Sequence, residues 1–424
     1  MTATDVLAEP LGAAEPEPPA RDLTPRQWLR TNLFSTPLNA LLTVVVGLAA
    51  AYVSYRLLRW VFVTADWTVV RVNLKLFMVG FFPADQLWRL WVAGFVLVVT
   101  VALALGAMTT TVRRPDDGTA AAPRGPAARA LDALHRFWPA VLAIVAILSF
   151  TRTVGPTLGV IGLIAAGVVA GIAGARVPRR LRRWMWVVPI VGVVVALQVI
   201  LLGDAGVGWD DWGGLHLVVA ATVAGIALAF PLGLLLALGR RSSLPAIRVA
   251  TIAYVEAFRA VPLVALLFLG QYMIGFLFPN TIEPPSFLVR AVIAITLFEA
   301  AYIAEIVRGG LQAVPRGQIE AAQAVGLSPV KVMRLVVLPQ ALRAVIPAMV
   351  GQFISLFKDT SLLAIVGFFE LLDVADAVTK QDAFRGAGLR PLTLAFVGLI
   401  YWAGCSTMSR ESQRLERRLG VGER

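Results

Sequence analysis

The sequence predicts an all-α polytopic membrane protein with about ten transmembrane helices. Of its 424 residues, 58% are hydrophobic and only 15% are charged, whereas a soluble domain has about 25% charged residues. Apolar runs of about 18 residues or more recur along the chain, and each can cross a bilayer as a helix. The runs are too long and too continuous for the strands of a membrane β-barrel.

The apolar runs define ten predicted spans. The span near residues 136–152 is short, so eight spans is the alternative count. The ten spans lie near residues 38–62, 87–107, 136–152, 157–175, 185–203, 214–239, 251–278, 286–307, 340–357 and 389–407.

Loop charge predicts the orientation of these spans. Both terminal segments and every second loop are rich in Arg and Lys, whereas loops such as GDAGVGWDDWGG and PNTIEPPS are acidic or neutral. Cytoplasmic loops carry the excess of basic residues, so we expect both termini in the cytoplasm. The net charge of +12 is spread over these loops, so nucleic-acid binding is not expected.

Composition also suggests how the chain is divided. Residues 1–30 are acidic near the start and rich in Pro and Ala, which predicts a disordered cytoplasmic tail. We expect an N-terminal membrane extension of about five spans over residues 31–205, a second membrane region over 206–412 and a basic cytoplasmic tail over 413–424. One Cys and two distant His residues give no clustered ligands, so no metal site is expected.

A polar segment between the eighth and ninth spans is the most distinctive part of the chain. Its sequence, EAAQAVGLSPVKVMRLVVLP, covers Glu320–Pro339. We expect a short helix over Gly317–Val325, ended by Gly326 in a left-handed turn. Ser328 and Pro329 then fit the start of a second, amphipathic helix. Helices this short need a partner to pack against.

This segment resembles the EAA signature of ABC-importer permeases, in which EAA, three residues, Gly and nine residues precede I-x-L-P. Here Val336 replaces the Ile. The resemblance implies a coupling helix near residues 317–326 that docks on a separate cytoplasmic ABC ATPase. The matching residues are Glu320, Ala321, Ala322, Gly326, Leu338 and Pro339.

The sequence contains no G-x-x-x-x-G-K-[ST] phosphate loop. We therefore expect a transport subunit rather than an enzyme. It would bind no cofactor itself, and the partner subunit would use ATP.

Three further runs narrow the resemblance to permeases of the polar amino-acid (His/Glu/Gln/Arg/opine) class. They are Tyr254–Tyr272, Ala301–Ala322 and Phe357–Gly367. The resemblance implies a permease core formed by the last five spans, in the bacterial inner membrane. The N-terminal half, through Ala65–Trp91, is similar to the M-type permease of general L-amino-acid importers.

The same resemblance implies two further partners, an extracytoplasmic solute-binding protein and a second permease. Because two copies of five extra spans would be redundant, a heterodimer is favoured over a homodimer. Membrane lipid surrounds the spans.

Ionisable residues inside the spans are costly and usually face the bundle interior. Glu256 and Arg259 on the seventh span, and Glu305 and Arg308 on the eighth, are each three residues apart. Residues at this spacing share one helix face. We expect these four to form a structural charge network that holds the two spans together.

Gln271, Glu299 and Tyr302 lie nearer the predicted bilayer centre and are the candidates for contact with the solute. An amino acid carries an ammonium and a carboxylate, so its site needs an acceptor and a donor, which Glu299 and Gln271 could supply. Lys358 and Asp359, at the outer end of the ninth span, would form a local pair or contact a docking protein at the outer mouth.

Alternative functions remain open at this point. The permease could carry another small solute. An ion-coupled secondary transporter could use Glu299 and Glu305 as proton or ion sites, but such a carrier needs no surface for an ATPase. A membrane enzyme is disfavoured because no catalytic constellation is visible in the sequence.

Overall fold

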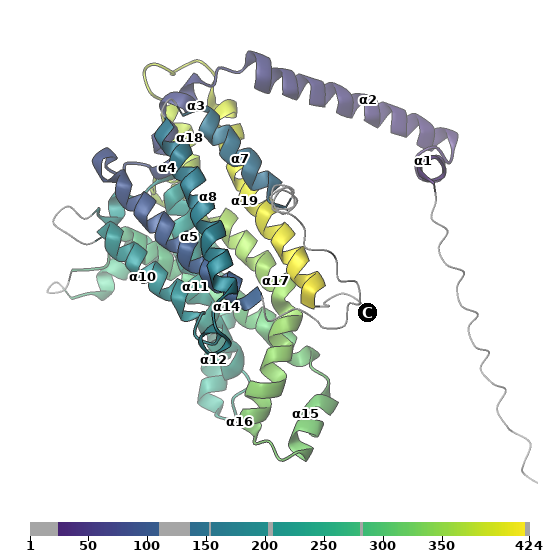
Figure 1. Ribbon diagram of the computed structural model, residues 1–424, viewed down its shortest axis with the longest axis vertical. Helices are drawn as coiled ribbons and strands as arrows, with labels where there is room; N and C mark the ends of the chain where they lie inside the picture. The colour runs from purple at the N-terminus through teal and green to yellow at the C-terminus, as the bar shows by residue number, and fades with distance from the viewer. Residues whose placement is uncertain (1–23, 110–135, 152–153, 202–206, 280–282, 420–424) are drawn as a thin grey trace, which may run out of the picture. The chain divides into compact units, whose positions relative to one another are not determined.

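The computed structural model describes residues 24–109, 136–151, 154–201, 207–279 and 283–419 (Figure 1). Over these residues the chain is helical, and its one isolated β-bridge joins Gly214 to Glu370. Seven helices are long and apolar enough to cross a membrane, and a bent pair of helices is an eighth candidate. The predicted all-α membrane class is confirmed.

Helices occupy all ten predicted spans, but two of them are short. α7 (Trp138–Ser149) has 12 residues and α10 (Val187–Leu201) has 15. At 1.5 Å per residue these helices reach about 18 and 22 Å, less than the hydrocarbon thickness of about 30 Å.

The chain divides into two compact units after Asp66. The first unit holds α1 (Pro25–Asn32), α2 (Pro37–Arg59) and the π-helical turn η1 (Trp60–Thr64). The prediction that residues 1–30 are disordered is wrong for the described part, since α1 begins at Pro25. Thr24 and Gln27 cap α1 reciprocally, and such a capping box satisfies backbone donors that would otherwise be unpaired. Residues 1–23 lie outside the described residues.

The second unit begins with the rest of the N-terminal extension. In it α5 packs against both α8 and α10. A Cβ at Gly106 would lie 2.1 Å from the carbonyl oxygen of Gly171, and one at Gly174 equally close to that of Leu103. Glycine therefore permits the close approach of α5 and α8, as small residues do in membrane helix pairs. The elements are α3 (Thr68–Val72), α4 (Leu74–Val79), η2 (Ala84–Gln86), α5 (Leu87–Thr109), α7, α8 (Val154–Ala175), α9 (Arg179–Arg182) and α10.

The second half of this unit is a helix bundle around α14. α11, α12, α13 and α17 all pack against α14, and α19 packs against α17. α15 and α16 lie at one end of the bundle, whereas α3 and α18 lie at the other (Figure 1). The elements are η3 (Trp209–Asp211), α11 (Gly214–Gly239), α12 (Pro245–Ala260), α13 (Leu263–Phe268), η4 (Leu269–Met273), η5 (Ile274–Leu277), α14 (Phe287–Ala313), α15 (Arg316–Ala324), α16 (Pro329–Val332), η6 (Met333–Val337), α17 (Leu338–Asp359), η7 (Thr360–Val366), α18 (Leu371–Val378) and α19 (Arg390–Leu419).

The extension from Trp67 onward packs directly on this bundle. α4 contacts α11 and α18, and α7 contacts α19. The amide side chains of Asn73 and Gln381 donate to each other's oxygens over 3.2 and 2.8 Å. The predicted boundary near residue 205, between the N-terminal extension and the second membrane region, therefore stays a prediction. The expected tail continues α19, which remains helical to Leu419.

The seventh predicted span is broken rather than continuous. α12 and α13 meet at an angle of 104°. Val261, between them, has the extended ψ of 135°, because the ring of a following proline disfavours helical geometry in the residue before it. Pro262 therefore ends α12 and begins a new helix direction.

Candidate coupling and transport sites

The predicted coupling segment forms a helical hairpin. α15 ends at Ala324, and Gly326 follows with a φ of +80°. The N–H of Leu327 donates to the carbonyl of Ala322 over 3.2 Å and that of Gly326 to Gln323 over 2.9 Å. Gly326 thus has the left-handed conformation that the sequence predicts at a helix C-terminus.

The second helix differs from the prediction, because it runs into the next span without a break. α16 continues through the π-helical η6 into α17, although Pro339 lies in the first turn of α17. Proline has no N–H to donate, and the Leu338 N–H before it bonds five residues back, to Met333. Ser328 occupies the N-cap of α16, but its side chain makes no capping hydrogen bond there.

The inner face of the hairpin is anchored to the membrane helices. Ala322, Val332 and Val337 are buried in one cluster with Val307 of α14 and Ala341 of α17. A force applied to the hairpin therefore reaches two membrane helices through packed side chains.

The hairpin also carries three exposed apolar side chains. Val325 and Val330 are each 75% exposed and Leu335 is 61% exposed. We call these three residues the coupling face. Glu320 and Ala321 are also exposed.

A network of charged side chains lies near the same end of the bundle. The Glu305 carboxylate accepts from Arg240, which directly follows α11, over 2.7 Å and lies 3.6 Å from Arg259 of α12. It also pairs with Arg308 on its own helix. Arg240 contacts Glu256 over 3.3 Å. The structure thus brings together the four predicted residues and adds Arg240, which joins α11, α12 and α14.

Three buried polar side chains lie on or beside α14 without full hydrogen bonding. Glu299 is fully buried, and Gln352 of α17 donates to its Oε2 over 3.0 Å. Glu299 Oε1, Thr296 Oγ1 and Gln271 Oε1 have no partner among the described residues. Buried polar atoms are nearly always paired, so these three are candidates for binding a polar solute.

Gln271 and Glu299 lie at different levels along the length of α14. Gln271 is on η4, and its neighbour Gly270 approaches Ala294, more than one helical turn from Glu299. Tyr302 packs on Phe298, with the Arg259 guanidinium 5.5 Å from its ring centre. Tyr302 therefore connects the charge network to the region around Glu299.

Lys358 and Asp359 end α17, and no ion pair joins them in the part of the chain that the structure describes. Lys358 instead lines a cavity of about 240 Å³ between α17 and α19. Tyr401 of α19 lines the same cavity. Of the two expectations for Lys358, the local pair is not formed.

Sequence reasoning missed Glu370, which is fully buried before α18. Its carboxylate accepts from the backbone N–H groups of Leu372 and Asp373 over 2.7 and 3.2 Å. The Tyr401 hydroxyl lies 3.3 Å from its other oxygen. Burial raises the pKa of Glu370 to about 7. The sequence offered one signal for Glu370, which is its position directly before an apolar helix. Glutamate is not among the preferred N-cap residues, so its presence there is unusual.

Helices that could span a membrane and unpaired polar groups buried between them are features expected of a membrane transport protein. A family model described as a binding-protein-dependent transport system inner membrane component matches residues 229–421. A glutamate/glutamine/aspartate/asparagine transport system permease protein of Rhodobacter capsulatus, BztC, is 36% identical over 427 residues, 93% of each chain. The chain therefore belongs to this family, the permeases of ABC importers.

Two other relatives are informative. The inner membrane amino-acid ABC transporter permease protein YhdY of Escherichia coli is 32% identical over 416 residues, and the match covers 93% of each chain. A glutamate/glutamine/aspartate/asparagine transport system permease protein of Rhodobacter capsulatus, BztB, is 50% identical over 93 residues, 22% of each chain.

Proposed function

We propose that this chain is the permease subunit of an ATP-driven importer of polar or general L-amino acids, coupled to a separate ABC ATPase. The coupling face carries the proposal. Three exposed apolar side chains, Val325, Val330 and Leu335, lie on a hairpin whose other face is packed into the bundle. Exposed apolar patches of this kind on a polar loop are typical of protein interfaces.

The hairpin is suited to transmit motion from such a partner. Gly326 fixes the turn, and η6 connects α16 to α17 without a flexible linker. Displacement of the coupling face would therefore move α17 against α14. Gln352 and Glu299 lie across this helix pair, so the proposed solute site would change shape as the ATPase closes.

The amino-acid substrate class is supported by the names of the relatives and by the chemistry near Glu299. The Glu299 carboxylate can accept hydrogen bonds from the ammonium of the solute. The NH2 group of Gln271 can donate to the carboxylate of the solute. The unpaired atoms, Glu299 Oε1 and Gln271 Oε1, are both acceptors, so the ammonium of the solute could donate to them. These groups would replace the hydrogen bonds that the solute loses on leaving water.

We infer a heterodimer with a second permease, because BztB and BztC are named as permeases of the same transport system. We also infer an extracytoplasmic solute-binding protein, cytoplasmic termini and no cofactor bound by this chain, with ATP used by the ATPase. The basic loops support this orientation.

Photocross-linking tests the docking step. A benzophenone probe is attached to a Val330→Cys variant in a Cys405→Ser background, since Cys405 is the single cysteine of the chain. In membranes containing the whole transporter, we expect a cross-link to the ATPase. The matched control is Lys380→Cys. The Lys380 side chain is 74% exposed and lies two residues after α18, which is at the opposite end of the bundle (Figure 1). A cross-link from Lys380→Cys, or none from Val330→Cys, would contradict the proposal.

A further inference from the structure

The last turns of α19 form a basic surface near one membrane interface. α19 has 30 residues, which is about 45 Å at 1.5 Å per residue. This exceeds the hydrocarbon thickness of about 30 Å. Counted from Arg390, about 20 residues cross the core, so the helix leaves it near Arg410.

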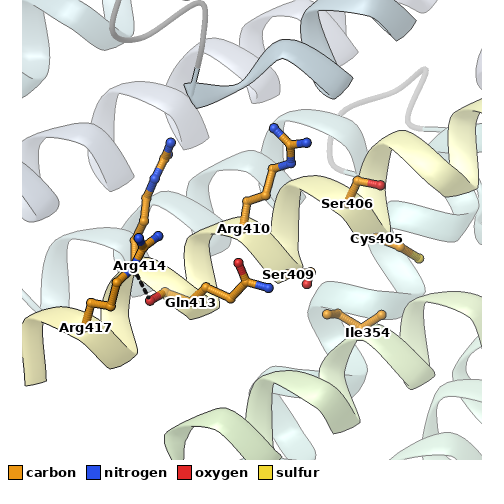
Figure 2. A pocket seen from close by; sticks show the side chains of 8 residues that line it. All are labelled: Ile354, Cys405, Ser406, Ser409, Arg410, Gln413, Arg414 and Arg417. Carbon is orange, nitrogen blue, oxygen red and sulfur yellow. Dashed lines mark hydrogen bonds between the residues drawn. The ribbon is translucent and has the colours of Figure 1, made fainter. Parts of the chain in front are cut away.

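A cavity of about 650 Å³ opens at this point beside α17. Figure 2 shows its side chains in sequence along α19, with Ile354 on the neighbouring helix. Among the described residues that line it, three are arginines and none is acidic. The eight lining residues are Ile354, Cys405, Ser406, Ser409, Arg410, Gln413, Arg414 and Arg417.

The positive charge at the cavity is only partly neutralised. Glu411 pairs with Arg414 over 2.7 Å, and it also accepts from Arg136 over 2.8 Å. Arg410 lies over the Trp138 ring at 4.7 Å, and Arg417 donates to the carbonyl of its own helix. Within the described ranges, no carboxylate pairs with Arg410 or Arg417.

Residues just before and at the start of α7 border this part of α19. Trp138 of α7 packs against Trp402 of α19, with ring centroids 5.4 Å apart. Arg136 and Trp138 belong to the N-terminal extension and lie outside residues 229–421, which the family model matches. The extension therefore completes this surface.

We propose that the cavity binds the headgroup of an anionic phospholipid from the surrounding bilayer. Arg410 and Arg417 would hold the phosphate, because the planar guanidinium matches phosphate oxygens in pairs. Ser409 and Gln413 would donate to the remaining headgroup oxygens. The volume of about 650 Å³ exceeds the need of a bare phosphate ion, and Ile354 in the cavity wall is suited to contact an acyl chain.

Native mass spectrometry of the detergent-purified permease tests the proposal. The complex is titrated with phosphatidylglycerol, with phosphatidylcholine or with inorganic phosphate. We expect the first phosphatidylglycerol to bind at least about tenfold more tightly than phosphatidylcholine, since the two arginines without carboxylate partners among the described residues attract a net negative headgroup, which phosphatidylcholine lacks. The double variant Arg410→Gln/Arg417→Gln should lose this preference. It keeps Arg414 and Glu411, so the helix pairing with Arg136 is retained.

The matched control is Arg180→Gln/Arg183→Gln, which removes two exposed arginines at α9. It should bind phosphatidylglycerol like the wild type. Equal loss in this control, equal binding of both lipids or displacement of the lipid by millimolar phosphate would overturn the proposal. So would an Arg410→Gln/Arg417→Gln variant that keeps the lipid but loses the second permease, because the surface would then be a protein interface.

Discussion

Replacing Gly326 with valine should uncouple ATP hydrolysis from transport. Gly326 has a φ of +80°, and apart from its two chain neighbours no described residue lies within 4 Å of the position that a Cβ would take. The substitution therefore meets no steric obstacle, and its cost is conformational. The left-handed region costs an L residue about 1–2 kcal/mol, and a β-branched side chain is stiffer still. This lowers the population of the native turn about 5- to 30-fold relative to other turn geometries.

The assay measures ATP hydrolysis and solute uptake together in proteoliposomes holding the complete transporter. We expect Gly326→Val to hydrolyse ATP at or above the basal rate while uptake falls about tenfold. Gly326→Asn should keep most of the uptake, because asparagine tolerates the left-handed conformation. Gly317→Ala, also uncrowded but within a helix, is the matched control. Normal uptake by Gly326→Val would refute the role of this turn.

Two other predictions concern buried carboxylates. Glu299→Gln keeps an oxygen for Gln352 but removes the charge, so apparent affinity for the solute should weaken about tenfold at normal protein levels; unchanged affinity and substrate range would make Glu299 structural. The folded-state pKa of Glu370 is about 7, above the ordinary value of about 4.3 for an unfolded glutamate. Its contribution to stability is therefore full below pH 4.3 and is lost as the pH rises through 7. The melting temperature should fall between pH 5 and 8 in the wild type and less steeply in Glu370→Gln; equal slopes would rule out this titration.

Local patterns in the sequence predicted the helices and the coupling turn. Apolar runs mark the spans, and the left-handed turn of Gly326 depends on its own backbone and the few residues before it. The bend between α12 and α13 was not predicted, because the local effect of Pro262 ends one helix without specifying the direction of the next.

The parts that sequence reasoning missed depend on contacts between distant residues. Spacing of three residues relates Glu256 to Arg259 and Glu305 to Arg308. Arg240, which bonds both carboxylates, is 16 and 65 positions away from them. The burial of Glu370 likewise depends on α19, through Tyr401, 31 positions later. Neither contact leaves a periodic signal along the chain.

ATP-dependent uptake tests whether this chain transports an amino acid with energy from a separate ATPase. The permease would be purified with its second permease and ATPase and reconstituted in vesicles. ATP is added on the side of the membrane that holds the ATPase, and the binding protein and labelled glutamate are added on the other side. We expect accumulation of the amino acid that requires ATP and is unaffected by collapse of proton and sodium gradients. Accumulation by this chain alone, driven by an ion gradient without ATP, would contradict it.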